Sequence, residues 1–365
     1  MKEFFEAYTA GMNSQDVRRL FQRDAWIAYR VLTRDQPRDE RARSRSARWV
    51  DGVRRGFLGM ISALSPARRL LFGVAMAAVV FGLLSVQNTV VLVPWTASPV
   101  GWLLASAAIL TFLLAMEVVD RVQVRDELEV ARHLQRELLP REAPPVPGYR
   151  FAHSYRTANE VGGDYYDFLP LPDGRLALVA GDASGHGMAA GLLMAIANAT
   201  LKTAMDFDAS PEAVLDLLNR VLVKTGDRRA FMTVFYGVLD PASGRLRYRC
   251  AGHPFPLLRR QDGRIEELGT GAFPLGIRDR VDWETREIVV HHGDLLVLYS
   301  DGLAEAFHPS AVEAYGYDRV RAQVAPGGTP QQVHDRILRD LEGFQHGEAL
   351  VDDVSVVVVG RESGD

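Results

Sequence analysis

The chain has 365 residues, with 42 Lys or Arg against 46 Asp or Glu and a formal net charge of -4, which argues against general nucleic-acid binding. Its single cysteine, Cys250, excludes an intrachain disulfide and a cysteine-based zinc site. The charge is unevenly spread, because residues 1–69 carry 15 basic against 8 acidic side chains and the C-terminal part is acidic. We interpret the two parts as meeting different environments.

Residues 1–69 predict a helical and basic N-terminal region. Phe4, Phe5 and Trp26 are among the apolar anchors of a helical stretch over residues 1–35. The basic linker that follows, residues 36–48, either lies against anionic lipid headgroups or is a solvated charged loop, and the sequence leaves both interpretations open.

A long uncharged stretch, from Leu70 to Met116, follows this region. Because about 20 apolar residues span a bilayer, we predict a two-span transmembrane hairpin over residues 70–119, with spans at 70–91 and 100–119. Arginines flank both outer ends of the hairpin and none lies in its loop, so the positive-inside rule places both termini in the cytoplasm. The prediction is a multi-pass protein of the cytoplasmic (inner) membrane; the alternative is a buried helical hairpin in a soluble protein.

Residues 120–140 predict a linker helix that continues from the second span, since no Gly or Pro interrupts them before Pro140. Apolar side chains recur along this helix at steps of three and four residues, the pattern of a short coiled coil. They are Val124, Leu128, Ala131, Leu134 and Leu138. The stripe supports either a parallel homodimer through the linker helix or a helix packed on its own domain. Pro-rich residues 141–148 mark the next domain boundary.

Residues 149–361 predict an α+β domain, with strands in series and clustered helices. Strands are predicted from apolar runs at 175–181, 231–240, 245–250, 294–300 and 354–359. Asp173-Gly174 and Asp262-Gly263 predict hairpin turns. Helices are predicted at 188–204, at 211–225 with Ser210 as N-cap, and at 330–341 with Thr329 as N-cap.

Acidic residues gather at or just beyond the ends of the most apolar strands and in the stretch EVGGDYYD. They are Asp164, Asp167, Asp182, Asp301, Asp352 and Asp353. A buried carboxylate must be paired or bind a metal, so neighbouring strand ends would collect these acids around cations, and oxygen-only ligands favour Mg²⁺ or Mn²⁺ over zinc. Singly, each acid has an ordinary alternative: Asp301-Gly302 can form a hairpin turn, and Asp164 can cap a helix.

Five motifs occur in order along this domain: GGDYYD, GDASGHG, CAGHPFPLL, YSDGLAEA and DDVSVVVV. Together they resemble the bacterial metal-dependent protein serine/threonine phosphatases of the protein phosphatase 2C-like group, typified by the stage II sporulation protein E family and its sigma-factor-regulating relatives. The stretch ARHLQRELLP is similar to that family's linker helix, so the resemblance covers about Leu128 to Gly360. It implies a β-sandwich flanked by helices (αββα), with two divalent ions, Mn²⁺ or Mg²⁺, in a cleft at one edge.

The resemblance also implies a set of metal ligands by position. They are Asp164, Asp182, Asp301, Asp352 and the backbone carbonyl of Ala183. Asp182 would bridge both ions, while Asp353 and Asp167 are weaker matches, as ligands or as neighbours of the ligands. Ser355 stands where Thr is usual in the family and Cys250 where Asn is common, and neither departure removes a ligand.

Two ions that share a water lower its pKa and clamp a phosphoryl group, so the implied reaction is hydrolysis without a covalent phosphoenzyme, with Asp182 as the central catalytic residue. His253 either assists the leaving oxygen or contacts the substrate, or is a structural turn histidine. His186 is expected to be a packing neighbour of the site rather than a ligand. Glycines around it let the backbone turn sharply, which frees the Ala183 carbonyl to face a metal.

From the resemblance alone, the substrate is expected to be phosphoserine or phosphothreonine on a STAS-type anti-sigma-factor antagonist in a partner-switching pathway. The hairpin and linker would then form a control arm, in which linker dimerisation completes metal binding. Two other classes stay open. One is a catalytically silent scaffold that binds a regulatory partner, against which the intact ligand set argues. The other is a hydrolase of small phosphoesters or nucleotides, for which the sequence shows no Walker A motif.

Overall fold

The structure is a computed structural model. It describes residues 51–86 (except 53, 56, 59 and 63), 99–185, 187–225, 230–308, 314–348 and 350–362. The predicted N-terminal helical stretch and basic linker, almost all of the loop between the predicted spans, and His186 lie outside the described residues. The chain divides into two compact units, residues 1–123 and 124–365.

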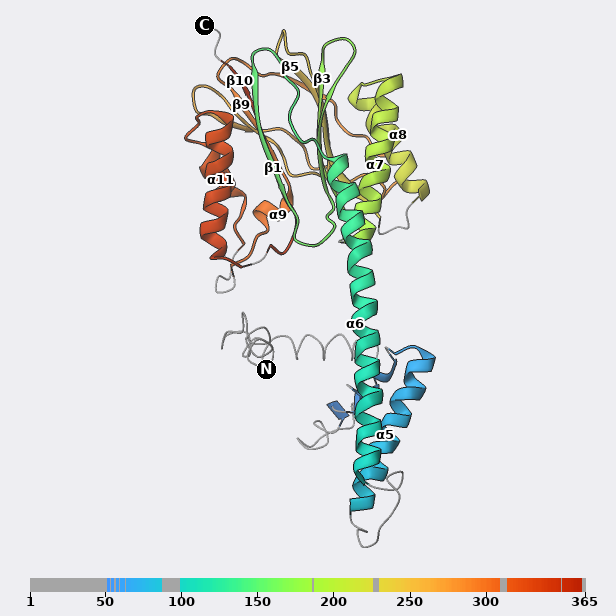
Figure 1. Ribbon diagram of the computed structural model, residues 1–365. Coiled ribbons are helices and arrows are strands. Elements are labelled where there is room, and N and C mark those ends of the chain that lie inside the picture. The colour runs from blue at the N-terminus through green and yellow to red at the C-terminus, as the bar shows by residue number, and fades with distance from the viewer. Residues whose placement is uncertain are drawn as a thin grey trace. The chain divides into compact units, whose positions relative to one another are not determined.

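The first unit contains α5 (Pro66–Val86) and the first part of α6 (Pro99–Leu138). The two helices pack antiparallel, because residues at opposite ends of them meet: the Arg68 guanidinium lies 2.6 Å from the Asp120 carboxylate, and the Phe81 ring centroid lies 5.8 Å from that of Trp102. Figure 1 shows α5 alongside this part of α6. The observed helix α5 begins before the predicted span, and residues 87–91 at the end of that span lie outside the described residues.

Three described helical segments are long and apolar enough to cross a membrane, judged by length and composition: Pro66–Leu84, Val100–Leu138 and Met188–Phe207. In the first two, only 17% and 11% of the most apolar window is buried, so most apolar side chains face outward. The third segment is α7 (Met188–Phe207), where the buried share is 39% because one face packs into the second unit.

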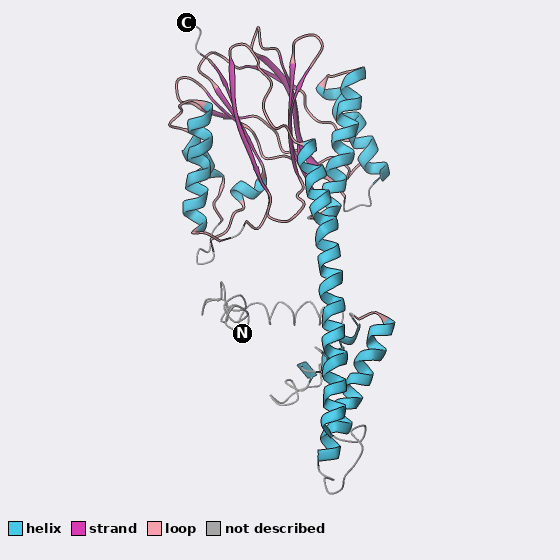
Figure 2. Cartoon of the chain, viewed as in Figure 1, coloured by secondary structure: helices cyan, strands magenta, loops and turns pink. Residues whose placement is uncertain are grey.

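The second unit is a sandwich of two antiparallel five-stranded sheets (Figure 2). Sheet A has the order β1 (Tyr149–Arg156), β10 (Val354–Arg361), β9 (Leu295–Tyr299), β6 (Leu257–Arg259) and β7 (Ile265–Glu267). Sheet B has the order β2 (Asp164–Pro170), β3 (Leu176–Ala183), β4 (Met232–Leu239), β5 (Arg245–Ala251) and β8 (Arg286–Val289).

Helices cover the outer face of each sheet. Figure 1 shows α7 and α8 (Pro211–Thr225) beside sheet B and α11 (Pro330–Gln345) beside sheet A. The short α9 (Asp301–Ala304) and α10 (Tyr317–Val324) complete the cover of sheet A. Strand β10 is buried on both faces, since Val357 and Val359 pack between the sheets while Val356 and Val358 pack under the helices. The predicted αββα sandwich is confirmed.

Several local predictions are confirmed. Gly174 and Gly263 adopt φ of 84° and 92° in the β2–β3 and β6–β7 turns, a conformation that glycine adopts readily. Ser210 accepts a hydrogen bond from the Ala213 N–H at 3.3 Å, and Thr329 forms a capping box with Gln332. Capping satisfies N–H groups that the first helical turn leaves unpaired.

The ordinary alternatives for two single acids are excluded, because Asp301-Gly302 opens α9 instead of a hairpin turn and Asp164 begins strand β2 instead of capping a helix. The strand predictions were incomplete, since β1 and β2 were not predicted. Strand β2 has acidic residues at two of its seven positions. Because of this polar character the sequence did not predict a strand here, although the strand is buried over most of its length. The short strands β6 to β8 were also not predicted.

Candidate metal centre

The β2–β3 hairpin brings the first two acids together. In the antiparallel register, Asp164 at the start of β2 lies directly opposite Asp182 near the end of β3. The residue before Asp164 must be small: a Cβ on Gly163 would lie 2.6 Å from the Ala183 carbonyl oxygen and 2.8 Å from Asp182 Oδ1. The hairpin therefore places two carboxylates and the Ala183 carbonyl against one stretch of backbone.

Sheet A supplies the remaining acids at the same edge. Asp301 begins α9 just after β9 ends, and Asp352 and Asp353 directly precede β10, which pairs with β9. The Ser300 N–H donates to the Ser355 carbonyl at 3.1 Å, which ties the two segments together. Hence the acids of both sheets lie at one end of the sandwich.

Burial and mutual repulsion raise the carboxyl pKa values of Asp164 and Asp182. Burial raises the pKa of Asp182 to about 8, and the negative charges of Asp301, Asp352 and Asp353 add to the rise. Burial followed by the charge of Asp182 holds the pKa of Asp164 well above its usual range. Raised carboxyl pKa values are typical of acids that share a site without a compensating cation.

A buried carboxylate oxygen of Asp164 lacks a hydrogen-bond partner in the described part of the chain. Asp164 is 1% exposed, and its Oδ2 atom is buried without a hydrogen-bond partner among the described residues. Buried polar atoms are almost always satisfied, so this oxygen is suited to a cation. Within the described part of the chain, no three His, Cys, Asp or Glu side chains converge tightly enough to enclose an ion in this conformation. The backbone brings the acids to one edge of the sandwich. To enclose an ion there, their side chains would have to rotate.

Asp353 differs from the other acids because the backbone already satisfies it. Its Oδ1 accepts from the Ala158 N–H at 2.8 Å and its Oδ2 from the Gly163 N–H at 2.6 Å. These bonds oppose the rise in its pKa that burial causes. Asp353 therefore holds the loop between β1 and β2, which leads directly into Asp164.

Asp167 lies outside the cluster. Successive side chains of a strand point to opposite faces, so Asp167 faces away from Asp164 and toward α7. There it accepts a hydrogen bond from the Tyr165 hydroxyl at 3.0 Å and forms an ion pair with Lys202 at 3.3 Å.

His253 lies behind the site rather than in an open cleft. It is 2% exposed, and its Nδ1 lies 3.0 Å from the hydroxyl oxygen of Thr233, the residue paired with Asp182 in the β3–β4 register. Burial lowers the pKa of His253 to about 3, so the ring is neutral at physiological pH. Its Nε2 is buried without a hydrogen-bond partner among the described residues, and the role of His253 stays a prediction.

Comparison with known proteins settles the family. The family model of stage II sporulation protein E (SpoIIE) matches residues 172–362, just over half of the chain. The chain belongs to the SpoIIE family.

Individual relatives agree with this assignment. The phosphoserine phosphatase RsbU of Bacillus subtilis is 27% identical over 184 residues, which are 50% of this chain and 55% of that protein. The crystal structure of the RsbU and RsbW domains of Rv1364c from Mycobacterium tuberculosis has a TM-score of 0.52 at 31% identity, covering 62% of this chain and 64% of that one. The SiaA-PP2C domain of Pseudomonas aeruginosa has a TM-score of 0.58 at 19% identity, covering 67% and 99%, which shows the fold alone. The chain spans about half the length of the curated relatives it matches.

These similarities confirm the predicted resemblance and the protein phosphatase 2C-like fold. The second unit also contains two residues near the site that the sequence analysis did not identify. Gln135 of α6 accepts from the Gly162 N–H at 3.0 Å and donates to the Gly162 carbonyl at 2.6 Å. The Tyr155 hydroxyl is buried near Asp353 and lies against the same glycine. The sequence signals for these contacts were the stretch ARHLQRELLP, which contains Gln135, and the Gly162-Gly163 pair.

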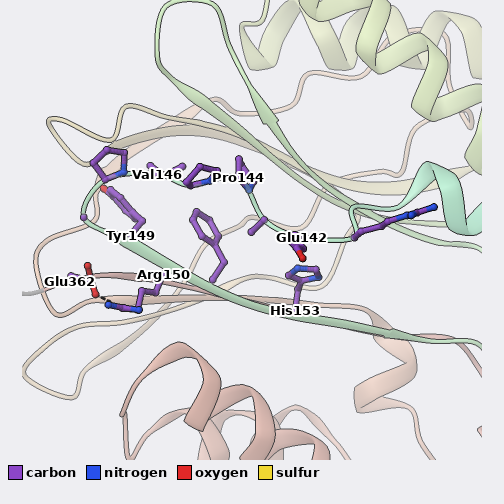
Figure 3. Close-up of a pocket in the computed structure, with 13 residues that line it drawn as sticks. Glu142, Pro144, Val146, Tyr149, Arg150, His153 and Glu362 are labelled. Carbon is purple, nitrogen blue, oxygen red and sulfur yellow. Dashed lines mark hydrogen bonds and ion pairs between the residues drawn. The ribbon is translucent and has the colours of Figure 1, made fainter.

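The SpoIIE-family domain has a separate hollow at the far end of β1. Its volume is about 690 Å³, and the Pro-rich segment at residues 141–148 lines it together with β1. Figure 3 shows Tyr149, Arg150 and His153 of β1 around this hollow, with the Arg150–Glu362 ion pair at its side. None of the clustered acids lines it.

Proposed function

We propose that this protein is a membrane-anchored, metal-dependent protein phosphatase that hydrolyses phosphoserine or phosphothreonine. The observation that carries the proposal is the pairing of Asp164 with Asp182, in which the buried Asp164 Oδ2 has no hydrogen-bond partner among the described residues. Membership of the SpoIIE family and the name of its relative RsbU as a phosphoserine phosphatase support the reaction class.

The chemistry of the available donors fits divalent cations that prefer oxygen. The proposed ligands are Asp164, Asp182, Asp301, Asp352 and the Ala183 carbonyl. All of these donors are oxygens, which suit Mg²⁺ or Mn²⁺. When bound, such ions would neutralise the clustered charge, activate water and stabilise a phosphoryl group.

The protein's own residues hold this donor set in place. Asp182 and Asp164 are fixed by hydrogen-bonded strands, and Asp353 holds the preceding loop through two backbone N–H groups. Gly185 and Gly187 adopt φ of 93° and 68° and turn the chain from β3 into α7. Strand ends fixed in this way are suited to a preorganised site.

For the substrate, we propose a phosphorylated STAS-type anti-sigma-factor antagonist in a partner-switching pathway. This choice is supported by the similarity to RsbU and by the similarity to a protein that carries an RsbU and an RsbW domain in one chain.

For the location, we propose that α5 and the first part of α6 form the two-span hairpin of a cytoplasmic-membrane protein. Large apolar side chains face outward on both helices, including Phe81 at 60% and Leu104 at 62% exposure. Small residues such as Ala75 and Ala78 are buried, which lets helices pack closely in a membrane. Outward apolar faces of this kind are stable in lipid and costly in water.

For control, we propose that dimerisation of the linker helix acts on the site through Gln135, whose side chain holds Gly162 from both sides and lies 3.3 Å from the Met194 sulfur on α7. Leu134 on the same helix is 61% exposed and is available to a second copy. A Leu134→Gln variant should weaken dimerisation and lower activity in membranes. The matched Arg136→Gln variant, changed on the other side of the helix, should do neither, and equal behaviour of the two variants would refute the control model.

The experiment for the reaction uses full-length protein in detergent or nanodiscs. After EDTA treatment and dialysis, phosphate release from a phosphoserine peptide should return with added Mn²⁺ and should not return with buffer alone. A phosphotyrosine peptide of the same sequence should be a poor substrate. Hydrolysis that is indifferent to EDTA, or that favours phosphotyrosine, would exclude the proposed function.

A further inference from the structure

Tyr155 occupies a position beside the acids that none of the interactions described so far explains. It is the penultimate residue of β1 and pairs with Ser355 on β10, two residues after Asp353. Its hydroxyl oxygen is fully buried and has no hydrogen-bond partner among the described residues. A buried hydroxyl without a partner is rare and unfavourable, so this atom needs an explanation.

The hydroxyl lies beside Asp353, above the backbone of Gly162. A Cβ on Gly162 would overlap both the Tyr155 hydroxyl oxygen and Asp353 Oδ2, so both oxygens lie over the same glycine, although no hydrogen bond joins them in this conformation. Asp353 Oδ2 is the same atom that accepts the Gly163 N–H at 2.6 Å. A path of close contacts thus leads from Tyr155 through Asp353 to the residue before Asp164.

The phenol is the donor of this pair, because its hydroxyl is protonated at neutral pH. A neutral phenol has one O–H to donate, and carboxylates can only accept when ionised.

We propose that Tyr155 is a positioning residue of the metal centre, with its O–H placed to donate to Asp353 and so to hold the Gly162–Gly163 turn that leads into Asp164. This inference rests on the proposed function. Hydrogen bonds to groups around metal ligands orient those ligands, and their loss typically lowers metal affinity by about 10–100-fold.

The strand offers a matched control. Tyr149 lies on the same strand at its other end, and its hydroxyl oxygen is also buried without a partner among the described residues. Its neighbours are Arg361 and Asp240 rather than the clustered acids. Tyr149→Phe and Tyr155→Phe remove the same atom from the same strand, but only the second change removes it from beside Asp353.

The test measures Mn²⁺ binding to metal-free, full-length protein without substrate, by titration calorimetry and by the electron paramagnetic resonance signal of free Mn²⁺. Tyr155→Phe should weaken Mn²⁺ affinity about tenfold or more, whereas Tyr149→Phe should bind like the wild type. In phosphate-release assays the Mn²⁺ concentration for half-maximal rate should rise for Tyr155→Phe, while the rate at saturating Mn²⁺ should stay close to that of the wild type.

A second pair of variants tests the same contact in case Tyr155→Phe does not fold. Gly162→Ala should also weaken Mn²⁺ binding, because its Cβ displaces both oxygens, while Gly343→Ala, where a Cβ meets nothing within 4 Å, should not. Wild-type affinity in Tyr155→Phe would overturn the inference while leaving the proposed function standing. Absence of Mn²⁺ binding in the wild type would overturn the proposed function and the inference together.

Discussion

Asp164 and Asp182 face each other across the β2–β3 hairpin at the end where both strands meet the edge of the sandwich. Their closeness, together with the acids of sheet A, raises the carboxyl pKa values at this edge. The hairpin thereby concentrates negative charge where a divalent cation would be most favourable.

Strand alternation gives a first prediction. Asp164→Asn removes a carboxylate from the cluster and should weaken Mn²⁺ binding by more than the about 10–100-fold that is typical of losing a supporting contact. Asp167→Asn, three residues along the same strand, should bind Mn²⁺ nearly as well as the wild type, because Asp167 faces α7 and pairs with Lys202. Calorimetric titration of both metal-free variants measures this, and equal losses would mean that Asp167 belongs to the site.

The pH dependence of the metal-free protein gives a second prediction. The folded pKa of Asp182, about 8, exceeds the unfolded value near 3.8, so the folded state binds more protons between these values. Its contribution to stability is therefore complete below about pH 4 and is lost as the pH rises through about 8. Thermal unfolding in EDTA should show a lower midpoint at pH 8.5 than at pH 6, and Asp182→Asn should reduce that difference. A midpoint that rises with pH in the wild type would contradict the raised pKa.

The linker contact gives a third prediction. Gln135→Ala leaves the buried N–H and carbonyl of Gly162 without their side-chain partner, and unsatisfied buried groups cost about 1–3 kcal/mol each. For the two groups together, the free energy of unfolding of the second unit should fall by about 2–6 kcal/mol in denaturant titrations. Glu129→Ala, at an exposed position on the same helix and in the same unit, is the control and should change little. If both variants unfold alike, Gln135 does not support the loop.

Membrane topology gives a fourth prediction, aided by the low reactivity of the native cysteine. Cys250 is buried and its pKa is raised to about 12, so it should not react with maleimides. In intact spheroplasts, a membrane-impermeant maleimide should label Thr96→Cys in the predicted loop between the spans, but should label Asp173→Cys in the β2–β3 turn only after lysis. The reverse pattern would invert the orientation, and a soluble protein would refute the hairpin.

The fold was predictable where the sequence carried strong periodic or turn signals. The apolar runs of β3, β4, β9 and β10 and the caps Ser210 and Thr329 are local features, and they appear at or near the predicted positions. Strand β2 was missed because Asp164 and Asp167 give it a polar appearance, although tertiary packing buries both of these side chains.

The site was predictable only in part, for a related reason. The positions of the acids at strand ends predicted which of them gather, because the ends of neighbouring strands lie together. The separation of Asp167 from Asp164 depends on strand register, and the burial of His253 depends on packing around β4, which no local pattern reveals. Contacts such as Tyr155 with Gly162 join residues of separate elements through backbone crowding and leave almost no trace in sequence.

The most direct test of the central claim is phosphate release from a phosphoserine protein substrate by full-length wild type, Asp182→Ala and Asp173→Ala in the presence of Mn²⁺. Asp173 is exposed in the β2–β3 turn, away from the acids, and serves as the matched control. The account predicts Mn²⁺-dependent release by the wild type and by Asp173→Ala, and loss of release by Asp182→Ala. Undiminished release by Asp182→Ala, or no release by the wild type, would contradict it.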